Sequence, residues 1–302
     1  MVLATNNPPS DLLDLAIIGA GPAALTAAIY AARAGISTTV FERTAIGGAL
    51  AEISHIANFP GFDGSGPELA KMMRTQAEAS GAHLTYGECS DIRKTSDYFS
   101  LTVDGEPRLA RTILVATGSE PRPLDPDLQY ALTVPVSYCA LCDGDLVKGK
   151  NVAVIGGANS ALQESLYLSE LAATVTIISH SAIKASTRLQ EQVANVPNIK
   201  LRPNTEPTAE LLNQFDHLFV FIGKRPATTF LKNLTTNANS DLFDTENYIR
   251  TTSVTNHSTP VSGLFVAGDV RSGALRQAIT AAADGATAAV EVAEYLKKHK
   301  NY

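Results

Sequence analysis

The chain repeats one sequence pattern at a constant spacing of 137 residues, and this repeat constrains the fold more than any other feature. Residues 15–42 (LAIIGAGPAALTAAIYAARAGISTTVFE) and 152–179 (VAVIGGANSALQESLYLSELAATVTIIS) each contain an apolar run, a turn of small residues, a helix-forming segment and a β-branched run. That order predicts a strand, a turn, a helix and a second strand, the βαβ unit of a doubly wound parallel sheet. The sequence therefore predicts an α/β fold with two three-layer, Rossmann-like domains.

The turn of the first unit carries a glycine pattern that suits a dinucleotide. It reads GAGPAA over residues 19–24, it follows a strand and opens a helix, and Glu42 stands twenty-three residues after Gly19. In such a unit Gly19 permits the tight turn, Gly21 lets backbone N–H groups approach a pyrophosphate at the helix N-terminus, and Glu42 can accept ribose hydroxyls. A glycine turn used only for packing is the alternative.

Length and composition exclude several classes of protein. With 302 residues, 45% of them hydrophobic and 18% charged, the chain can bury a large core and is not intrinsically disordered. The 24 basic and 30 acidic residues give a formal net charge of −6, which argues against a nucleic-acid ligand. Three cysteines are too few for a disulfide-rich secreted scaffold, so we expect a reducing compartment.

One uncharged stretch, residues 15–32, has the eighteen residues at which a membrane helix is first considered. Gly19, Gly21 and Pro22 divide it into a strand, a turn and a helix. Residues 1–14 contain no Lys or Arg, unlike the basic start of a signal peptide. We therefore expect a soluble, cytoplasmic protein with no membrane segment.

A Cys-x-x-Cys motif, Cys139 and Cys142, stands directly before Asp143. A structural zinc site needs about four ligands; Cys89 is the only other cysteine and no histidine lies at a ligand spacing, so no metal is expected. Two inert core thiols are a further alternative. The pattern favours redox exchange, because a thiolate that attacks a disulfide needs a second thiol to resolve the mixed disulfide. Cys89 itself is predicted to be a small core residue.

A third apolar run, residues 263–270 (GLFVAGDV), is followed by Arg276-Gln277-Ala278 and an alanine-rich helix. Together with five other short motifs, this run resembles the low-molecular-weight thioredoxin reductase family of flavoproteins. The five motifs are residues 19–24, Gly47-Gly48, 58–61 (NFPG), 116–118 (ATG) and 139–144 (CALCDG), and the resemblance covers nearly the whole chain. The resemblance implies a discontinuous FAD-binding domain, residues 1–119 and 247–302. A NAD(P)H-type domain, residues 120–246, would be inserted into it and would carry the Cys-x-x-Cys.

The resemblance implies that FAD is the cofactor. Its pyrophosphate would lie on the first glycine turn, its adenosine ribose on Glu42 and its ribitol on Asp269. Its isoalloxazine would lie near Asn58, Arg276, Gln277 and Ala278. The full implied set is Gly19, Ala20, Gly21, Pro22, Ala23, Glu42, Gly48, Ala49, Leu50, Asn58, Ala116, Thr117, Gly118, Gly268, Asp269, Arg276, Gln277 and Ala278. Ala49 replaces the glutamine that usually follows the Gly-Gly pair, which removes one polar contact of the family pattern. For Asp269 a turn-forming role is the alternative.

The resemblance also assigns roles at the Cys-x-x-Cys. The second cysteine, Cys142, would face the flavin, and the first, Cys139, would attack the disulfide of a thioredoxin-like protein or small molecule. Asp143 would act as the acid/base, because a carboxylate beside the cysteines can relay the proton that thiolate departure demands; a solvated turn residue is the alternative. A homodimer is implied as well, with a rotation between its domains.

The second glycine turn departs from the pattern of a nicotinamide dinucleotide site. Ala158 stands at the close-approach position, and Ser179-His180-Ser181 follow where the first unit has Glu42. NADPH-dependent family members carry a His-Arg-Arg motif and a further Arg here, and these arginines are absent. One overpacked methyl costs about 1–3 kcal/mol and each missing charge-assisted bond about 1.5–3 kcal/mol, so NADPH binding is predicted to be weaker by roughly 10³-fold or more. Lys184 and Arg188 are cations that could partly compensate.

A chain that binds FAD and keeps the Cys-x-x-Cys, but does not use NADPH, needs another electron donor for its FAD. The departures resemble ferredoxin-dependent flavin thioredoxin reductases, in which ferredoxin or flavodoxin reduces FAD, and also a diflavin branch with a second FAD in the degenerate site. An oxygen-dependent dithiol oxidase is an alternative, although its relatives usually have His where Asp143 stands. An ordinary NADPH thioredoxin reductase and a non-catalytic flavin sensor also stay open.

Docking of an acidic carrier would need a basic patch. Its candidates are Arg271, Arg276, Lys297, Lys298 and Lys300, with ordinary solvated surface as the alternative. Tyr302 is a candidate to stack on a flavin of the partner subunit, with a frayed terminus as the alternative.

Overall fold

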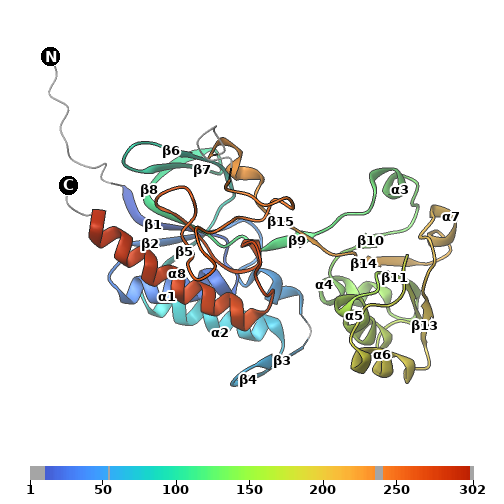
Figure 1. Ribbon diagram of the computed structural model, residues 1–302. Helices are drawn as coiled ribbons and strands as arrows, with labels where there is room; N and C mark the ends of the chain where they lie inside the picture. The colour runs from blue at the N-terminus through green and yellow to red at the C-terminus, as the bar shows by residue number, and fades with distance from the viewer. Residues whose placement is uncertain (1–10, 54, 235–240, 300–302) are drawn as a thin grey trace, which may run out of the picture. The chain divides into compact units, whose positions relative to one another are not determined.

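The computed structural model describes residues 11–53, 55–234 and 241–299 (Figure 1). The chain divides into two units, residues 1–119 with 226–302 and residues 120–225. By this division residues 226–234 and 241–246 lie in the first unit, whereas the sequence analysis assigns residues 120–246 to the inserted domain. The physical reason is that the short helix η3 (Thr229–Leu234) buries Leu231 and Leu234 in the core of the first unit, where η3 packs on strand β6 (Cys89–Lys94).

The first unit is built on a seven-stranded sheet in the order β5-β2-β1-β8-β7-β6, with β16 paired to β8. Strands β5, β2, β1, β8 and β16 pair in parallel, and β8, β7 and β6 pair antiparallel. Besides β6, the bounds are β1 (Leu12–Ile18), β2 (Thr38–Glu42), β5 (His83–Tyr86), β7 (Phe99–Val103), β8 (Glu106–Val115) and β16 (Leu264–Val266). Residues 15–18 of β1 are buried on both faces, as expected of a central parallel strand.

Two further two-stranded sheets lie outside the large sheet. β3 (Ile56–Phe59) and β4 (Phe62–Gly64) form an antiparallel pair. β9 (Ser119–Pro121) pairs with β15 (Lys224–Pro226), and the chain passes between the two units within these strands.

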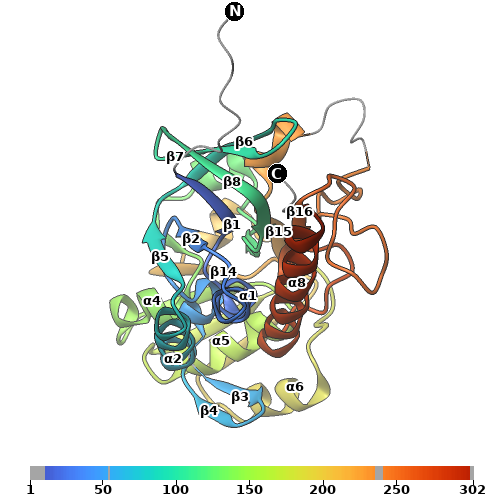
Figure 2. The ribbon, with the colours of Figure 1, turned by 90° about the vertical axis from the view of Figure 1, so that its left-hand side faces the viewer.

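Three helices lie side by side along one face of the large sheet (Figures 1 and 2): α1 (Pro22–Arg33), α2 (Gly66–Ala79) and α8 (Ala278–His299). A capping box at Ser65 and Glu68 begins α2. Small residues let α8 approach α1 closely; a Cβ added at Gly285 would stand 2.0 Å from the carbonyl oxygen of Ala23. The short helices η1 (Gly48–Glu52) and η4 (Gly268–Val270) lie in the loops near these helices' starts.

The second unit has a five-stranded, all-parallel sheet in the order β10-β14-β11-β12-β13. The bounds are β10 (Val136–Ser137), β11 (Asn151–Ile155), β12 (Thr174–Ile178), β13 (Ile199–Arg202), β14 (His217–Val220), α3 (Pro126–Tyr130), α4 (Ala140–Asp143), η2 (Gly144–Val147), α5 (Asn159–Ser169), α6 (Thr187–Ala194) and α7 (Ala209–Leu212). Successive residues of β11 enter opposite cores, Val152 and Val154 one, Ala153 and Ile155 the other. The predicted α/β fold with two Rossmann-like domains is confirmed.

The uncharged stretch 15–32 divides between β1 and α1, as the glycines predict. Among the helices of the described residues, none is both long enough and apolar enough to cross a membrane.

Candidate active site

The first glycine turn lies between β1 and α1. Gly19 has a φ of +97°, and a Cβ there would stand 2.5 Å from the carbonyl oxygen of Ala116, so only glycine fits. Gly21 is the N-cap of α1 with no side-chain hydrogen bond over the helix start, and Pro22 has no N–H to satisfy. The first N–H groups of α1 are thus left uncapped, which is the arrangement that holds a pyrophosphate.

Backbone from distant segments closes around this turn. A Cβ on Gly48, at the start of η1, would lie 3.3 Å from the Cα of Gly21. A Cβ on Gly268, at the start of η4, would lie 2.9 Å from the Cβ of Ala23. A Cβ on Gly21 itself would meet no heavy atom nearer than 4.0 Å, so the space in front of the helix is open. This backbone-lined cradle fits a pyrophosphate.

Glu42, the last residue of β2, is buried beside the turn. Its Oε2 accepts a hydrogen bond from the Ala20 N–H (2.8 Å), and its Oε1 accepts from the N–H (2.8 Å) and hydroxyl (3.1 Å) of Thr44. Each carboxylate oxygen can accept two hydrogen bonds, so Oε2 keeps one position for a ribose hydroxyl.

Two residues implied for the isoalloxazine meet across the fold. Asn58 in β3 donates from Nδ2 to Oε1 of Gln277, which precedes α8, at 2.9 Å. Arg276 instead lies over the ring of Tyr248, 4.4 Å from its centroid. Tyr248 is a contact that sequence reasoning missed, because nothing in the local pattern links it to position 276.

The other implied residues follow the ends of parallel strands or begin helices. Ala116, Thr117 and Gly118 follow β8, Ala49 and Leu50 lie in η1, Asp269 lies in η4, and Ala278 begins α8. The Thr117 hydroxyl donates to the Ala227 carbonyl at 2.8 Å, which anchors this segment. Ligands of open α/β sheets bind at the carboxyl ends of the strands, and most of this set gathers there.

Cys139 and Cys142 form a disulfide at the start of α4, with the sulfurs 2.09 Å apart. Within this chain Cys142 is exposed and Cys139 is half-buried. The backbone N–H of Cys142 donates to the Cys139 Sγ at 3.1 Å. Asp143, half-buried, ends the same short helix, so all three predicted catalytic residues lie within one turn.

A buried histidine lies behind this motif and was missed by sequence reasoning. His217 in β14 has Nε2 2.8 Å from the hydroxyl of Ser137, two residues before Cys139. Burial lowers the pKa of His217; the charge of Asp143 opposes this shift and that of Lys150 adds to it. The imidazole is therefore neutral near pH 7.

The remaining cysteine has a structural role. Cys89 is buried at the start of β6, and burial raises the pKa of its thiol to about 12. A thiol with that pKa carries almost no thiolate at neutral pH, so it is unreactive. This agrees with the prediction of a small core residue.

The turn of the second unit repeats the backbone of the first. Gly156 has a φ of +148°, and a Cβ there would stand 2.4 Å from the Phe221 carbonyl oxygen. The Lys184 N–H donates to the Gly157 carbonyl at 2.7 Å, and at the same 137-residue spacing the Gly47 N–H donates to the Ala20 carbonyl at 2.8 Å.

Ala158 replaces the open glycine of the first turn at the N-cap of α5, which likewise has no side-chain cap. Ala158 is exposed, and the matching position of the first unit, Gly21, likewise faces open space. Any cost of that methyl therefore falls on a bound ligand.

The ribose end of the second unit differs from the first. Ser179, after β12, is buried, and a Cβ added at Gly157 would lie 2.3 Å from its Oγ, so the hydroxyl packs against the turn. The next residue, His180, has Nδ1 2.5 Å from Oε2 of Glu206. This edge therefore presents a carboxylate beside an imidazole.

A family model described as pyridine nucleotide-disulphide oxidoreductase matches residues 13–285. This chain belongs to the pyridine nucleotide-disulphide oxidoreductase family. Thioredoxin reductase of Bacillus subtilis is 33% identical, covering 95% of this chain and 96% of the relative, and that of Borreliella burgdorferi is 35% identical, covering 94% and 92%. A crystal structure of Lactococcus lactis thioredoxin reductase matches with a TM-score of 0.86 at 30% identity, covering 95% of this chain and 99% of that one.

Membership makes this protein an enzyme, a flavin-dependent disulfide oxidoreductase of the thioredoxin reductase type, and FAD is the cofactor that the family implies. The residues of the first unit fit that cofactor through the open backbone cradle and the acceptor position on Glu42. The resemblance to low-molecular-weight thioredoxin reductases is confirmed at this level.

The basic residues considered for docking have different environments in this oxidoreductase. Arg271 is paired with Asp284, its Nε 3.0 Å from Oδ2, with only 17% of its side chain exposed; it is not a free surface cation, which corrects that candidate. Lys297 and Lys298 are exposed in the last turn of α8. Lys300 and Tyr302 lie outside the described residues.

Proposed function

We propose that this oxidoreductase reduces the disulfide of a thioredoxin-like protein or small molecule with electrons that reach FAD from ferredoxin or flavodoxin rather than from NADPH. The observation that carries the proposal is the pairing of His180 with Glu206 at the end of β12. Residues 179–183 (SHSAI) contain no Lys or Arg, and Lys184 follows them. The 2′-phosphate of NADPH would meet a carboxylate where the NADPH-dependent family members offer arginines.

The magnitude of this effect is large enough to change the electron donor. Two missing charge-assisted hydrogen bonds cost about 1.5–3 kcal/mol each, which corresponds to roughly 10²- to 10⁴-fold weaker binding. Repulsion between the phosphate and an exposed carboxylate adds about 1 kcal/mol per charge pair at 4 Å in water. The residues present therefore suit NADPH poorly, although the turn itself is preserved.

The role of the disulfide follows from the contacts around it. FAD, when bound, supplies the two electrons that reduce the disulfide and can itself be filled one electron at a time. Reduction of the Cys139–Cys142 bond takes two electrons and two protons and leaves two thiols. The Cys142 N–H that donates to the Cys139 sulfur favours a thiolate on Cys139.

Disulfide exchange then completes the turnover. The Cys139 thiolate attacks one sulfur of the substrate disulfide and releases the other as a thiolate, to which Asp143 can relay a proton. The Cys142 thiolate next attacks Cys139 in the mixed disulfide, releases the second substrate thiolate and restores the intramolecular bond. We place this enzyme in the cytoplasm as a homodimer, and sedimentation of the purified protein tests the oligomeric state.

An anaerobic titration tests the electron donor. The purified yellow protein receives NADPH, then NADH, then reduced ferredoxin or flavodoxin, while the visible flavin absorbance is followed. The proposal expects bleaching by a carrier protein alone. Rapid bleaching by NADPH would overturn it. No bleaching by any donor would also overturn it and would favour a dithiol oxidase or a diflavin enzyme. Oxygen uptake with a dithiol would indicate the oxidase, and two FAD molecules per chain would indicate the diflavin enzyme.

A matched variant tests the residue pair itself. Glu206→Gln keeps a hydrogen-bonding group beside His180 and removes the negative charge. It is expected to tighten NADPH binding by about fivefold for a contribution of 1 kcal/mol. The dissociation constant of NADH, which lacks the 2′-phosphate, serves as the control and should not change. Equal changes for both nucleotides would contradict the assigned repulsion.

An ordinary NADPH-driven thioredoxin reductase is the second candidate. The observation in its favour is the second turn, whose backbone hydrogen bond from Lys184 to Gly157 repeats that of the first turn. The relatives named thioredoxin reductase over nearly their full length also support it. Bleaching by NADPH at micromolar concentrations would select this candidate.

A further inference from the structure

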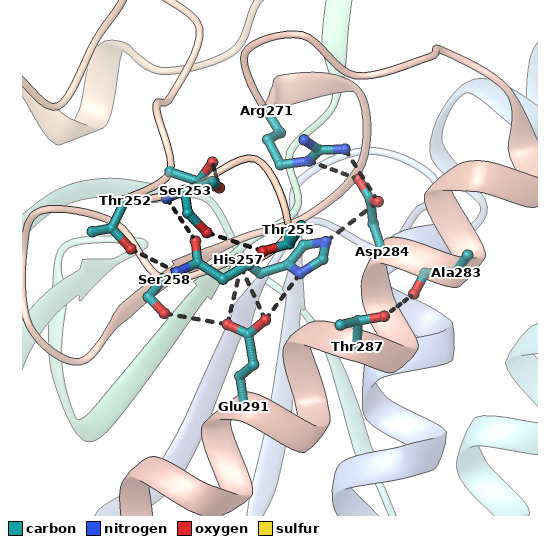
Figure 3. A network of polar contacts seen from close by, with 12 residues as sticks. Thr252, Ser253, Thr255, His257, Ser258, Arg271, Ala283, Asp284, Thr287 and Glu291 are labelled. Atoms are coloured by element: carbon teal, nitrogen blue, oxygen red, sulfur yellow. Dashed lines mark hydrogen bonds and ion pairs between the residues drawn. The ribbon is translucent and has the colours of Figure 1, made fainter.

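A buried cluster of ionisable side chains, His257, Arg271, Asp284 and Glu291, lies beside η4, the turn that carries Asp269. Figure 3 shows these four residues. Asp284 and Glu291, on the same side of α8, flank His257, whose Nε2 is 3.3 Å from Oδ1 of Asp284 and whose Nδ1 is 3.3 Å from Oε1 of Glu291. Arg271 contacts Asp284 as well, with Nε 3.0 Å from Oδ2. No more than 21% of any of these four side chains is exposed. The proposed reaction uses none of them directly.

Asp284 holds both ends of η4. Its Oδ2 accepts a hydrogen bond from the backbone N–H of Gly268 at 3.1 Å, and the same carboxylate accepts two from the Arg271 guanidinium. Gly268 has a φ of +75°, a left-handed conformation that a turn must impose. Asp269 stands between these two anchors, so the conformation that presents Asp269 depends on Asp284.

His257 and Glu291 hold the neighbouring loop instead. The backbone N–H of His257 donates to both Glu291 carboxylate oxygens (3.1 and 2.9 Å), and the hydroxyl of Ser258 donates to Oε2 (3.2 Å). The His257 carbonyl accepts from the Val266 N–H of β16 at 2.9 Å. The cluster therefore has two halves: Asp284 anchors the turn after β16, and Glu291 anchors the loop before it.

The Asp284 half stays ionised. Burial acts to raise the pKa of Asp284, but the adjacent His257 imidazole and the hydrogen bonds from Arg271 and Gly268 outweigh it and hold that pKa below its usual range. A carboxylate is therefore available to accept from Gly268 and Arg271 at neutral pH. Hydrogen bonds to a charged acceptor are the stronger kind, which suits a fixed anchor.

We propose that Asp284 is a positioning residue for FAD: it fixes the Gly268–Asp269 turn so that Asp269 is already placed to bind the ribitol. This inference rests on the FAD-binding role proposed for that turn. A preset turn costs no ordering when the cofactor binds, which is how preorganisation improves affinity. Glu291 shares the helix face and the histidine but not the turn, so it offers a matched control.

The experiment compares FAD with ADP as ligands of the deflavinated full-length protein. ADP carries the adenosine and pyrophosphate but lacks the ribitol, so it reports the cradle at Gly19 and Glu42 alone. Asp284→Asn is expected to weaken FAD binding by about 10- to 100-fold and to leave ADP binding unchanged. Glu291→Gln is expected to lower the melting temperature while both affinities change by less than about threefold.

Specific outcomes would overturn the proposal. Equal weakening of FAD and ADP by Asp284→Asn would show general damage to the unit, and an FAD affinity within about twofold of the parent would show that the anchor is dispensable. Failure of the unaltered chain to bind FAD would overturn the proposed function itself. If Asp284→Asn does not fold, Arg271→Lys tests the same anchor, because lysine keeps the charge and loses the two-point contact; a selective loss of FAD affinity of about 3- to 10-fold is expected.

Discussion

Substitution of Gly285 by alanine tests whether the close contact between α8 and α1 sets the position of the first glycine turn. A Cβ at position 285 would stand 2.0 Å from the carbonyl oxygen of Ala23, 2.8 Å from its carbonyl carbon and 3.1 Å from its Cα. The shortest contact lies about 1.5 Å inside ordinary van der Waals distance. All three atoms belong to the backbone of the first turn of α1, so no side-chain rotation can make room and the helices must separate.

Two opposing effects decide the size of the change. Alanine favours a helix interior over glycine by about 1 kcal/mol. Overpacking costs about 1–3 kcal/mol, and a clash with backbone belongs at the upper end of that range. The expected net loss is therefore about 2 kcal/mol, or roughly a 30-fold fall in the ratio of folded to unfolded protein. FAD affinity should fall as well, because the uncapped N–H groups of α1 move with the helix.

Urea unfolding followed by circular dichroism, together with FAD titration, provides the assay. Ala283→Gly, at an exposed position of the same helix, changes helix propensity without a packing change and should cost about 1 kcal/mol. If Gly285→Ala instead stabilised the protein by about the amount that Ala283→Gly destabilises it, propensity would outweigh packing and the reasoning would be refuted.

The disulfide, the buried thiol and the buried imidazole each give a further expected outcome. Cys142→Ser should trap a mixed disulfide between Cys139 and the substrate, visible by mass spectrometry without reductant; free release of the substrate would contradict the order of attack. Cys89 should resist iodoacetamide in the native protein at about pH 8 and react after unfolding, and rapid labelling of the native form would contradict its burial. The pKa of His217 is lowered by burial, so the unfolded chain takes up the proton first and stability should fall as the pH drops below about 6.5. His217→Gln should remove part of that slope in urea midpoints measured against pH, and an unchanged slope would assign it to other groups.

Much of the architecture follows from the sequence, because its signals are local. The repeat at 137 residues predicts both βαβ units, since alternating strands and glycine turns depend on neighbouring residues. Gly19 illustrates the point: the turn needs a positive φ, which glycine adopts readily, so the residue type itself reports the geometry. The Cys-x-x-Cys is equally local, because two residues between cysteines let one short helix bring the sulfurs together.

Other parts of the site depend on segments that meet only in the folded chain. Asn58 contacts Gln277 across 219 positions, and the pairing of Arg271 with Asp284 depends on η4 and α8 lying together. No pattern along the chain distinguishes Arg271 from an exposed arginine, because its environment is supplied by another element.

The same distinction explains why the sequence predicted neither the end of the inserted domain nor the cluster around His257. Leu231 belongs to the first unit because it packs near β6, although it follows the inserted segment in the sequence. In the sequence Asp284 and Glu291 are indistinguishable from ordinary helix carboxylates. In the folded chain a loop places His257 between them. Local conformation is encoded by adjacent residues, so the sequence alone determined the two nucleotide-type units and the redox motif. Which buried ionisable groups contact one another depends on packing between distant segments. Only the tertiary structure therefore decided that Asp284 and Arg271 anchor the turn at Asp269.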